Sequence, residues 1–281
     1  MRHIYIYTYL LLAMLVGCES DADIDIKAER KTVVYAFVEA GDRCEVHAYQ
    51  SILFTEASAK KPLGEETEVN VIIDGKESHT KQLSETATSV EFDGLELHSG
   101  SSIEVKVVRE GKQLVYASSY IPSEPTIRLT RGDEIEKEGQ YYKSCTLMLN
   151  DDGIGDNYYQ LLARDTKTGD VIEGVKYIGR IFEESKSSII NDDEGRGLFT
   201  NANLAGRIIK LNCDIPMKDV EGDIELELYH MTYEHYCYMQ SVAIHKAYML
   251  LPVFGQNGLY NNVVNGIGLL SGVARTKVLV E

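Results

Sequence analysis

Short segments in which apolar and polar residues alternate, separated by turn signals, run through most of this chain of 281 residues. In Ser102–Glu110, an isoleucine and valines alternate with charged residues, so the two kinds of side chain point to opposite faces of a strand. Asp74-Gly75 closes another such segment and is typical of a hairpin turn. Strands spaced about 8–12 residues apart, with turns between them, predict a β-sandwich.

A segment with two prolines divides the predicted strands into two groups. Ile121–Pro125 (IPSEP) holds two of the five prolines of the chain, and proline keeps the backbone extended without donating to a sheet. The 264 residues that follow position 17 suit two domains. We therefore predict an immunoglobulin-like β-sandwich over residues 31–121 and a second β-rich domain, sandwich or barrel-like, over residues 126–281.

Towards the end of the chain, the spacing of apolar residues changes from that of a strand to that of a helix. Thr232 is a candidate N-cap and Pro252 stands where the apolar pattern ends, so one helix is predicted near residues 233–250, with a terminal strand after it. The predicted fold class is all-β with one C-terminal helix. The residues that recur at helical spacing are Tyr236, Met239, Ala243 and Ala247.

The N-terminus has the pattern of an export signal. Arg2 and His3 precede Ile4–Val16, which is almost entirely apolar or tyrosine. This length falls in the range of roughly 7–15 apolar residues for an export signal and below the about 20 needed to span a bilayer. Residues 1–17 are therefore predicted to be an export signal peptide, with a buried N-terminal strand or helix as the alternative.

Leu15-Val16-Gly17-Cys18 resembles the lipobox of bacterial lipoproteins. In those proteins the signal is cut before the cysteine, which then carries several acyl chains such as palmitate. Each buried methylene contributes about 0.8 kcal/mol, so several chains give stable anchoring. We predict lipidation of Cys18 and an acidic leash over residues 18–30.

The chain is strongly acidic, with 44 acidic and 28 basic residues and a formal net charge of -16. Loss of residues 1–17 would remove Arg2 and no acid, which leaves 27 basic residues and a net charge of -17. Nucleic acids and anionic membrane faces attract lysine and arginine. We therefore expect no nucleic-acid partner, and contact with the membrane through the lipid anchor.

Four cysteines follow Cys18, without CxxC spacing. An exported chain can form disulfides, and four cysteines allow three pairings, between which the sequence does not choose. Because all four lie in apolar or alternating segments, we favour buried free thiols. These cysteines are Cys44, Cys145, Cys213 and Cys237.

Several segments, taken in order, resemble the Bacteroidota outer-membrane lipoprotein family catalogued as domain of unknown function 4249. The resemblance covers nearly the whole mature chain. Besides the lipobox and the leash it rests on KTVVYAFVEAG (31–41), GDNYYQLLARD (155–165), GLFTNANLAGR (197–207), TYEHYCYMQSV (232–242) and NNVVNGIGLLSG (261–272).

The resemblance implies an outer-membrane lipoprotein with no assigned reaction. Members of the family are often suspected of working beside TonB-dependent transporters. In the same phylum, acidic residues just after the lipidated cysteine resemble a surface-export signal. The ESDAD stretch (19–23) therefore implies exposure at the cell surface.

Three motifs mimic binding sites. Gly266–Gly272 (GIGLLSG) resembles a dinucleotide fingerprint, but a predicted strand follows it where a helix is required, so we expect a bend or bulge. Asp151–Asn157 and Asn191–Gly195 could hold calcium, yet the same residue types dominate turns, and we expect turns. Arg131–Asp133 (RGD) is a turn-prone triplet of common residues, which we do not take as an adhesion site.

No set of residues in the sequence has the spacing of a catalytic or metal site. There is no GxSxG nucleophile elbow. His235 and His245 are ten residues apart, which is too far to share an ion on one helix, and we expect these two and His230 to lie at the surface or the edge of the core. Cys237 does not face His235, because residues two apart on a helix diverge. We predict no catalytic residues, no cofactor and no metal.

Tyrosines are the candidate binding residues, since a tyrosine ring can stack on a ligand while its hydroxyl hydrogen-bonds. Neighbours on a strand point to opposite faces, so one of each adjacent pair is expected in the core. The candidates are Tyr141, Tyr142, Tyr158 and Tyr159.

These observations predict a lipid-anchored, non-enzymatic outer-membrane accessory or binding protein, exposed at the cell surface. Its partner would be an outer-membrane transporter, or a nutrient held near one. A surface glycan- or matrix-binding adhesin is the alternative, with an exposed aromatic patch as its discriminating feature. A hydrolase ranks third and would require a deep pocket that holds a carboxylate or histidine with a perturbed pKa.

Overall fold

The computed structural model describes the chain from residue 29 to residue 280 with short gaps. The described residues are 29–52, 60–151, 153–179, 189–192, 194–202, 204, 206–249 and 258–280. The predicted signal peptide, Cys18 and Pro252 lie outside them. Among the described residues, no helix is both long enough and apolar enough to cross a membrane.

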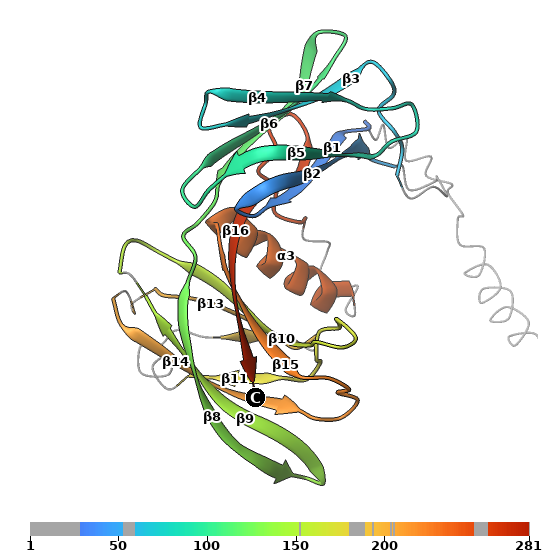
Figure 1. Ribbon diagram of the computed structural model, residues 1–281. Helices are drawn as coiled ribbons and strands as arrows, with labels where there is room; N and C mark the ends of the chain where they lie inside the picture. The colour runs from blue at the N-terminus through green and yellow to red at the C-terminus, as the bar shows by residue number, and fades with distance from the viewer. Residues whose placement is uncertain are drawn as a thin grey trace, which may run out of the picture.

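The strands of the described chain form three sheets (Figure 1). The eight-stranded sheet has the order β12 (Ile190–Asn191), β13 (Arg196–Thr200), β10 (Tyr158–Asp165), β15 (Ile224–Met231), β16 (Ile267–Val280), β1 (Thr32–Val38), β2 (Gly41–Gln50), β5 (Ser89–Leu97). One four-stranded sheet has the order β4 (Glu77–Gln82), β3 (Thr67–Ile73), β6 (Ser102–Arg109), β7 (Lys112–Tyr120). The other has the order β11 (Lys176–Ile178), β14 (Ile208–Pro216), β9 (Gln140–Asn150), β8 (Thr126–Lys137).

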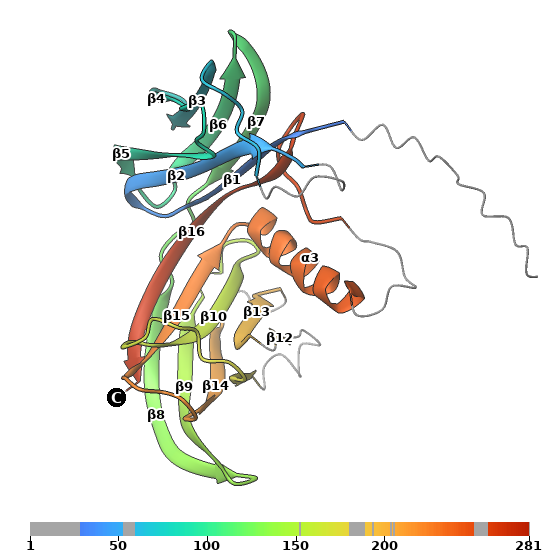
Figure 2. The same cartoon turned by 90° about the vertical axis from the view of Figure 1, so that its right-hand side faces the viewer.

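The last strand, β16, joins the two halves of the large sheet. Its first residues pair in parallel with β1, from Val33 with Ile267 to Val38 with Gly272. Its remaining residues pair antiparallel with β15. Both figures of the whole chain show β16 running between the two ends of the molecule, with one of the two smaller sheets at each end (Figures 1 and 2).

Alternation along β16 decides which layers cover which face of the large sheet. Leu270 belongs to the core of the first sandwich and Val280 to the core of the second. Both positions are even-numbered, so both small sheets pack on the same face. The odd-numbered Val273 packs with Tyr236 of the helix α3 (Tyr233–Met249), which therefore covers the opposite face (Figure 2).

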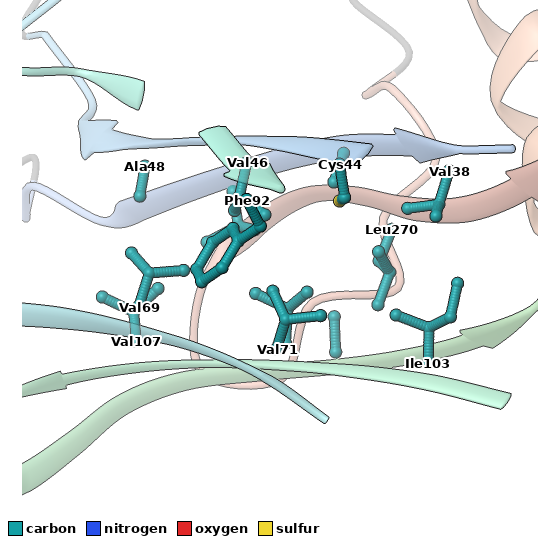
Figure 3. Packing of buried hydrophobic residues seen from close by; sticks show 14 of the residues in the cluster. Val38, Cys44, Val46, Ala48, Val69, Val71, Phe92, Ile103, Val107 and Leu270 are labelled. Atoms are coloured by element: carbon teal, nitrogen blue, oxygen red, sulfur yellow. The ribbon is translucent and has the colours of Figure 1, made fainter. Parts of the chain in front are cut away.

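The first sandwich has a continuous core of aliphatic residues. Figure 3 shows Val46 and Phe92 from one sheet pointing towards Val69, Val71 and Val107 from the other. All five are at most 1% exposed. Full burial of such a side chain contributes about 1.5–3 kcal/mol, so this face fixes the register of the strands that carry it. The predicted β-sandwich is thereby confirmed.

The second half is also a sandwich. The sheet that contains β9 and β14 packs on β10 and β15 through buried residues that include Leu147, Leu211, Leu161 and Leu228. The all-β fold class with one C-terminal helix is confirmed. The segment 121–125 connects β7 to β8, but the division there stays a prediction, because β16 adds residues from the end of the chain to the first sandwich.

The helix α3 covers almost the predicted range but begins without the predicted side-chain cap. The backbone carbonyl of Thr232 accepts a hydrogen bond from the amide of Tyr236, 3.1 Å away, as expected of a residue just before a helix. The hydroxyl of Thr232 is buried and makes no hydrogen bond within the described residues. Packing of the helix on the large sheet, instead of a capping hydroxyl, therefore holds its first turn.

Candidate functional site

Four tyrosines gather around the first turns of α3, and we call them the tyrosine cluster. They are Tyr120, Tyr158, Tyr233 and Tyr260: Tyr158 interacts electrostatically with Tyr120 and Tyr233, and Tyr233 with Tyr260. Tyr120 ends β7, Tyr158 begins β10, Tyr233 begins α3, and Tyr260 precedes β16. The folded arrangement thus brings together the ends of elements from both halves of the molecule.

A buried aromatic residue supports one side of the cluster. The ring centroid of Tyr158 lies 5.0 Å from that of Tyr236, which is only 9% exposed. The ring of Tyr158 also lies 5.4 Å from that of Tyr233, at an interplanar angle of 55°. Tyr233 is 52% exposed and Tyr120 is 48% exposed. The cluster therefore presents aromatic surface to solvent on a fixed base.

The carboxylate of Glu234 gives the cluster its charge. Burial raises the pKa of the Tyr120 and Tyr260 hydroxyls, and the nearby negative charge of Glu234 raises both further. A hydrogen bond to the sulfur of Cys237, one helical turn away, raises the pKa of Tyr233. These phenols are therefore neutral at pH 7. Exposed rings, neutral hydroxyls and a carboxylate together suit a ligand rich in hydroxyl groups.

The four tyrosines predicted from sequence do not come together. Tyr158 lies in the tyrosine cluster, whereas Tyr159 is buried and stacks on Phe199 with ring centroids 5.2 Å apart. Tyr141 is 60% exposed on β9, and the ring of Tyr142 lies 6.0 Å from the Lys137 ammonium near the β8–β9 turn. The sequence around Tyr120, Tyr233 and Tyr260 does not mark them as binding residues, because each lies in an ordinary strand end, helix start or loop.

The three histidines have separate environments. Nδ1 of His230 lies 2.8 Å from the carbonyl oxygen of Ser123, and Nδ1 of His235 lies 2.7 Å from the hydroxyl of Ser271. Burial lowers the pKa of His235 to about 4, so its imidazole is neutral at pH 7. Ser271 is fully buried in β16, so this serine–histidine pair cannot receive a substrate without movement of the strand.

Two cavities lie away from the tyrosine cluster. One of about 500 Å³ is lined by Asp165, whose pKa is lowered, chiefly by the backbone amide of Glu221 and then by those of Lys167 and Gly222. Asp165 therefore holds the loop after β10 to the turn before β15.

The other cavity, of about 370 Å³, lies between α3 and the strands β12 and β13. Glu194 pairs there with Arg196 and Lys246. The hydrogen bond from Lys246 is the main cause of the lowered pKa of Glu194. The shifted carboxylates that line the two cavities are thus held as anions, whereas a general acid needs a raised pKa.

The motifs that mimic binding sites have structural roles. Oδ1 of Asp151 accepts a hydrogen bond from the backbone amide of Gly153 at 2.9 Å, and Oδ2 accepts one from the side-chain amide of Asn201 at 2.6 Å. The Asp151 carboxylate therefore stabilises the predicted turn at residues 151–157 through these hydrogen bonds. Within the described chain, no group of three or more His, Cys, Asp or Glu side chains could hold a metal ion.

The glycine-rich and RGD motifs also lie in strands. A Cβ at Gly268 would lie 1.8 Å from the carbonyl oxygen of Val34, so the fingerprint-like glycines permit close approach of two backbones. All of the motif after Gly266 lies inside β16, which continues as the predicted terminal strand to Val280. The RGD triplet lies in β8, where the register shifts between Arg131 and Glu134.

Comparison with known proteins identifies a family but no activity. A family model described as "Domain of unknown function (DUF4249)" matches residues 19–278. No curated protein matches the sequence.

The chain is similar to several solved structures at low identity. A segment of two fibronectin type-III domains from chicken tenascin is 9% identical, with 72% of this chain and 91% of that chain covered and a TM-score of 0.24. A β-glucuronidase of glycoside hydrolase family 2 is 10% identical, with 71% and 18% covered and a TM-score of 0.24. Bovine butyrophilin is 10% identical, with 72% and 92% covered and a TM-score of 0.20. Similarity at these TM-scores carries no argument about the site.

Proposed function

The chain belongs to the family described as domain of unknown function DUF4249, and on that premise we propose that it is a lipid-anchored, non-enzymatic binding protein of the outer membrane. The observation that carries this proposal is the lipobox-like Leu15-Val16-Gly17-Cys18, which follows a short apolar segment and precedes an acidic leash. The lipid on Cys18 would hold the two sandwiches at the membrane surface. Bacteroidota origin stays a prediction.

The proposed partner is an outer-membrane transporter, or a nutrient held near one, with the protein exposed at the cell surface. Two observations support binding rather than catalysis. The shifted carboxylates that line the cavities are stabilised as anions, and the hydroxyl next to His235 belongs to the buried Ser271. Affinity purification from native membranes tests the partner, and repeated recovery of the protein without any membrane protein would contradict it.

Cys18→Ala is expected to move the protein from the membrane fraction to the soluble fraction. The reason is that no acyl chain can then be attached, and each buried methylene contributes about 0.8 kcal/mol to anchoring. The measurement is fractionation of cells followed by detergent partitioning. Cys237→Ala is the matched control, because it also removes one cysteine and should stay with the membrane. Persistence of the Cys18→Ala variant in the membrane fraction would refute the anchor.

Glycan binding is a second candidate function, and the tyrosine cluster favours it. The exposed rings of Tyr120 and Tyr233 stand beside the carboxylate of Glu234. Aromatic rings can stack on the apolar faces of sugars, while phenol and carboxylate groups hydrogen-bond to their hydroxyls. This surface is the aromatic patch that would distinguish a glycan-binding protein from a transporter accessory.

Tyr233→Ala is expected to weaken binding of any glycan found on an array by about tenfold, which corresponds to about 1.4 kcal/mol. Isothermal titration with the hit glycan measures the change. Tyr141→Ala is the control, since Tyr141 is 60% exposed but lies on β9 outside the cluster. Equal affinities of the two variants, or an array without hits, would count against glycan binding.

A further inference from the structure

Two cysteines face each other across a pair of strands in the second sandwich. Cys145 of β9 and Cys213 of β14 are direct register partners in an antiparallel pairing. Residues directly opposite in such a pairing have Cα atoms about 4.5 or 5.5 Å apart, and both values lie within the about 4.4–6.8 Å that a disulfide spans. Both side chains belong to the buried core of the second sandwich, so they lie on the same face of this sheet. The two cysteines are therefore direct neighbours across the strands.

The other two described cysteines lack this arrangement. Cys44 is buried in the core of the first sandwich, and Cys237 lies on α3 beside Tyr233. A single buried cysteine is adequately explained as a small apolar core residue. That explanation accounts for the burial of Cys145 and Cys213, but it does not require the two to be register partners.

We propose that Cys145 and Cys213 form a disulfide when the chain folds in the presence of a disulfide-bonded oxidant. The thiolate of one cysteine attacks the oxidant, forms a mixed disulfide and releases one thiol of the oxidant. The thiolate of the other cysteine then attacks the cysteine sulfur of the mixed disulfide and releases the second thiol. Two protein thiols are thereby oxidised to one disulfide, and one oxidant disulfide is reduced to two thiols.

Burial decides when oxidation can occur. Cys145 is 1% exposed and Cys213 is fully buried, and so is Tyr177, the register partner of Cys213 on β11. An oxidant cannot reach either sulfur in the closed sandwich. The disulfide should therefore form rapidly during folding and slowly in the folded, reduced protein.

The test uses the full chain with Cys18→Ala, which leaves Cys44, Cys145, Cys213 and Cys237. The unfolded, reduced protein is refolded with reduced and oxidised glutathione, alkylated, and analysed by peptide mass mapping without reduction. The expected result is the loss of two of four free thiols, one linked peptide pair that joins Cys145 to Cys213, and a melting temperature several degrees above that of the reduced protein.

Variants identify the pair. Cys213→Ala should abolish the linked peptides, whereas Cys44→Ala and Cys237→Ala should retain them. Because Cys213→Ala leaves a small space in the core, the peptide map of the parent protein is decisive if this variant does not fold. Four free thiols after refolding in the glutathione buffer, or a link that joins any other two cysteines, would overturn the proposal.

Discussion

Gly272→Ala is expected to destabilise the folded protein by about 3 kcal/mol or to prevent folding. A Cβ at position 272 would lie 1.8 Å from the carbonyl oxygen of Tyr120 and 2.6 Å from its carbonyl carbon. Both are backbone atoms, so the overlap cannot be relieved by rotation of a side chain. The strand β16 or the end of β7 would have to move.

The position of Gly272 in the large sheet explains the size of this effect. Pairing of β16 with β1 ends at Gly272, and pairing with β15 begins at Val273. The amide of Gly272 also donates to the hydroxyl of Ser119 at 3.2 Å. A shift there would disturb the cores of both sandwiches.

Gly258→Ala is the matched control, because an added Cβ at Gly258 meets no atom within 4 Å and its backbone needs no positive φ. Chemical denaturation monitored by circular dichroism measures both variants. Gly258→Ala should change the free energy of unfolding by about 0.5 kcal/mol or less. If the Gly272→Ala protein is as stable as the parent, the backbones of β7 and β16 do not approach each other as closely as described.

Glu227→Gln should lower the free energy of unfolding at pH 7 by about 3 kcal/mol, the cost of breaking a buried ion pair. The side chain of Glu227 is 1% exposed. Its Oε2 accepts hydrogen bonds from Arg164 at 3.1 Å and from Tyr229 at 2.8 Å. Lys277 Nζ lies 2.6 Å from Oε1. The neutral amide would leave these cations without their shared anion.

The pH dependence distinguishes charge from packing as the cause. Burial opposes ionisation of Glu227, but Lys277, Arg164 and Tyr229 outweigh burial and lower its pKa from 4.5 to about 2. A lowered pKa means that the charge stabilises the folded state above pH 4.5 and that this stability is lost as the pH falls towards 2. The difference between the parent and Glu227→Gln should therefore shrink below pH 4.5.

Glu221→Gln provides the control for an exposed ion pair. Glu221 pairs with Lys167 at 2.8 Å, but their side chains are 58% and 64% exposed. Surface pairs of this kind contribute about 0–1 kcal/mol. If urea denaturation gives equal losses for the two variants, or a difference that does not depend on pH, the buried charge cluster does not stabilise the fold as we expect.

Local patterns in the sequence were sufficient for the fold class and for most individual elements. The alternation in Ser102–Glu110 predicts β6, and the apolar period after Thr232 predicts α3 to within a residue. Such signals are reliable because a half-buried strand or helix imposes its own period on the residues that form it. The family is likewise indicated by several weak segments in a fixed order along the chain, and the family match over residues 19–278 confirms it.

The sequence alone also carries the prediction of the anchor, because a lipobox is read from contiguous residues that end at Cys18. The partners of the strands required the tertiary structure. β1 pairs with β16, although the residues Val33 and Ile267 are far apart in the chain. No local pattern specifies that pairing, because any strand with the same alternation can cover an apolar face.

The same reason limits what the sequence could say about sites. The tyrosine cluster joins Tyr120 and Tyr260 to the start of α3, and the pairing of Cys145 with Cys213 depends on the register of β9 with β14. Sequence determined the kinds of elements and carries the prediction of a signal at the N-terminus, since both depend on neighbouring residues. Only the tertiary structure decided which residues meet, because burial of shared apolar faces selects the partners of each strand.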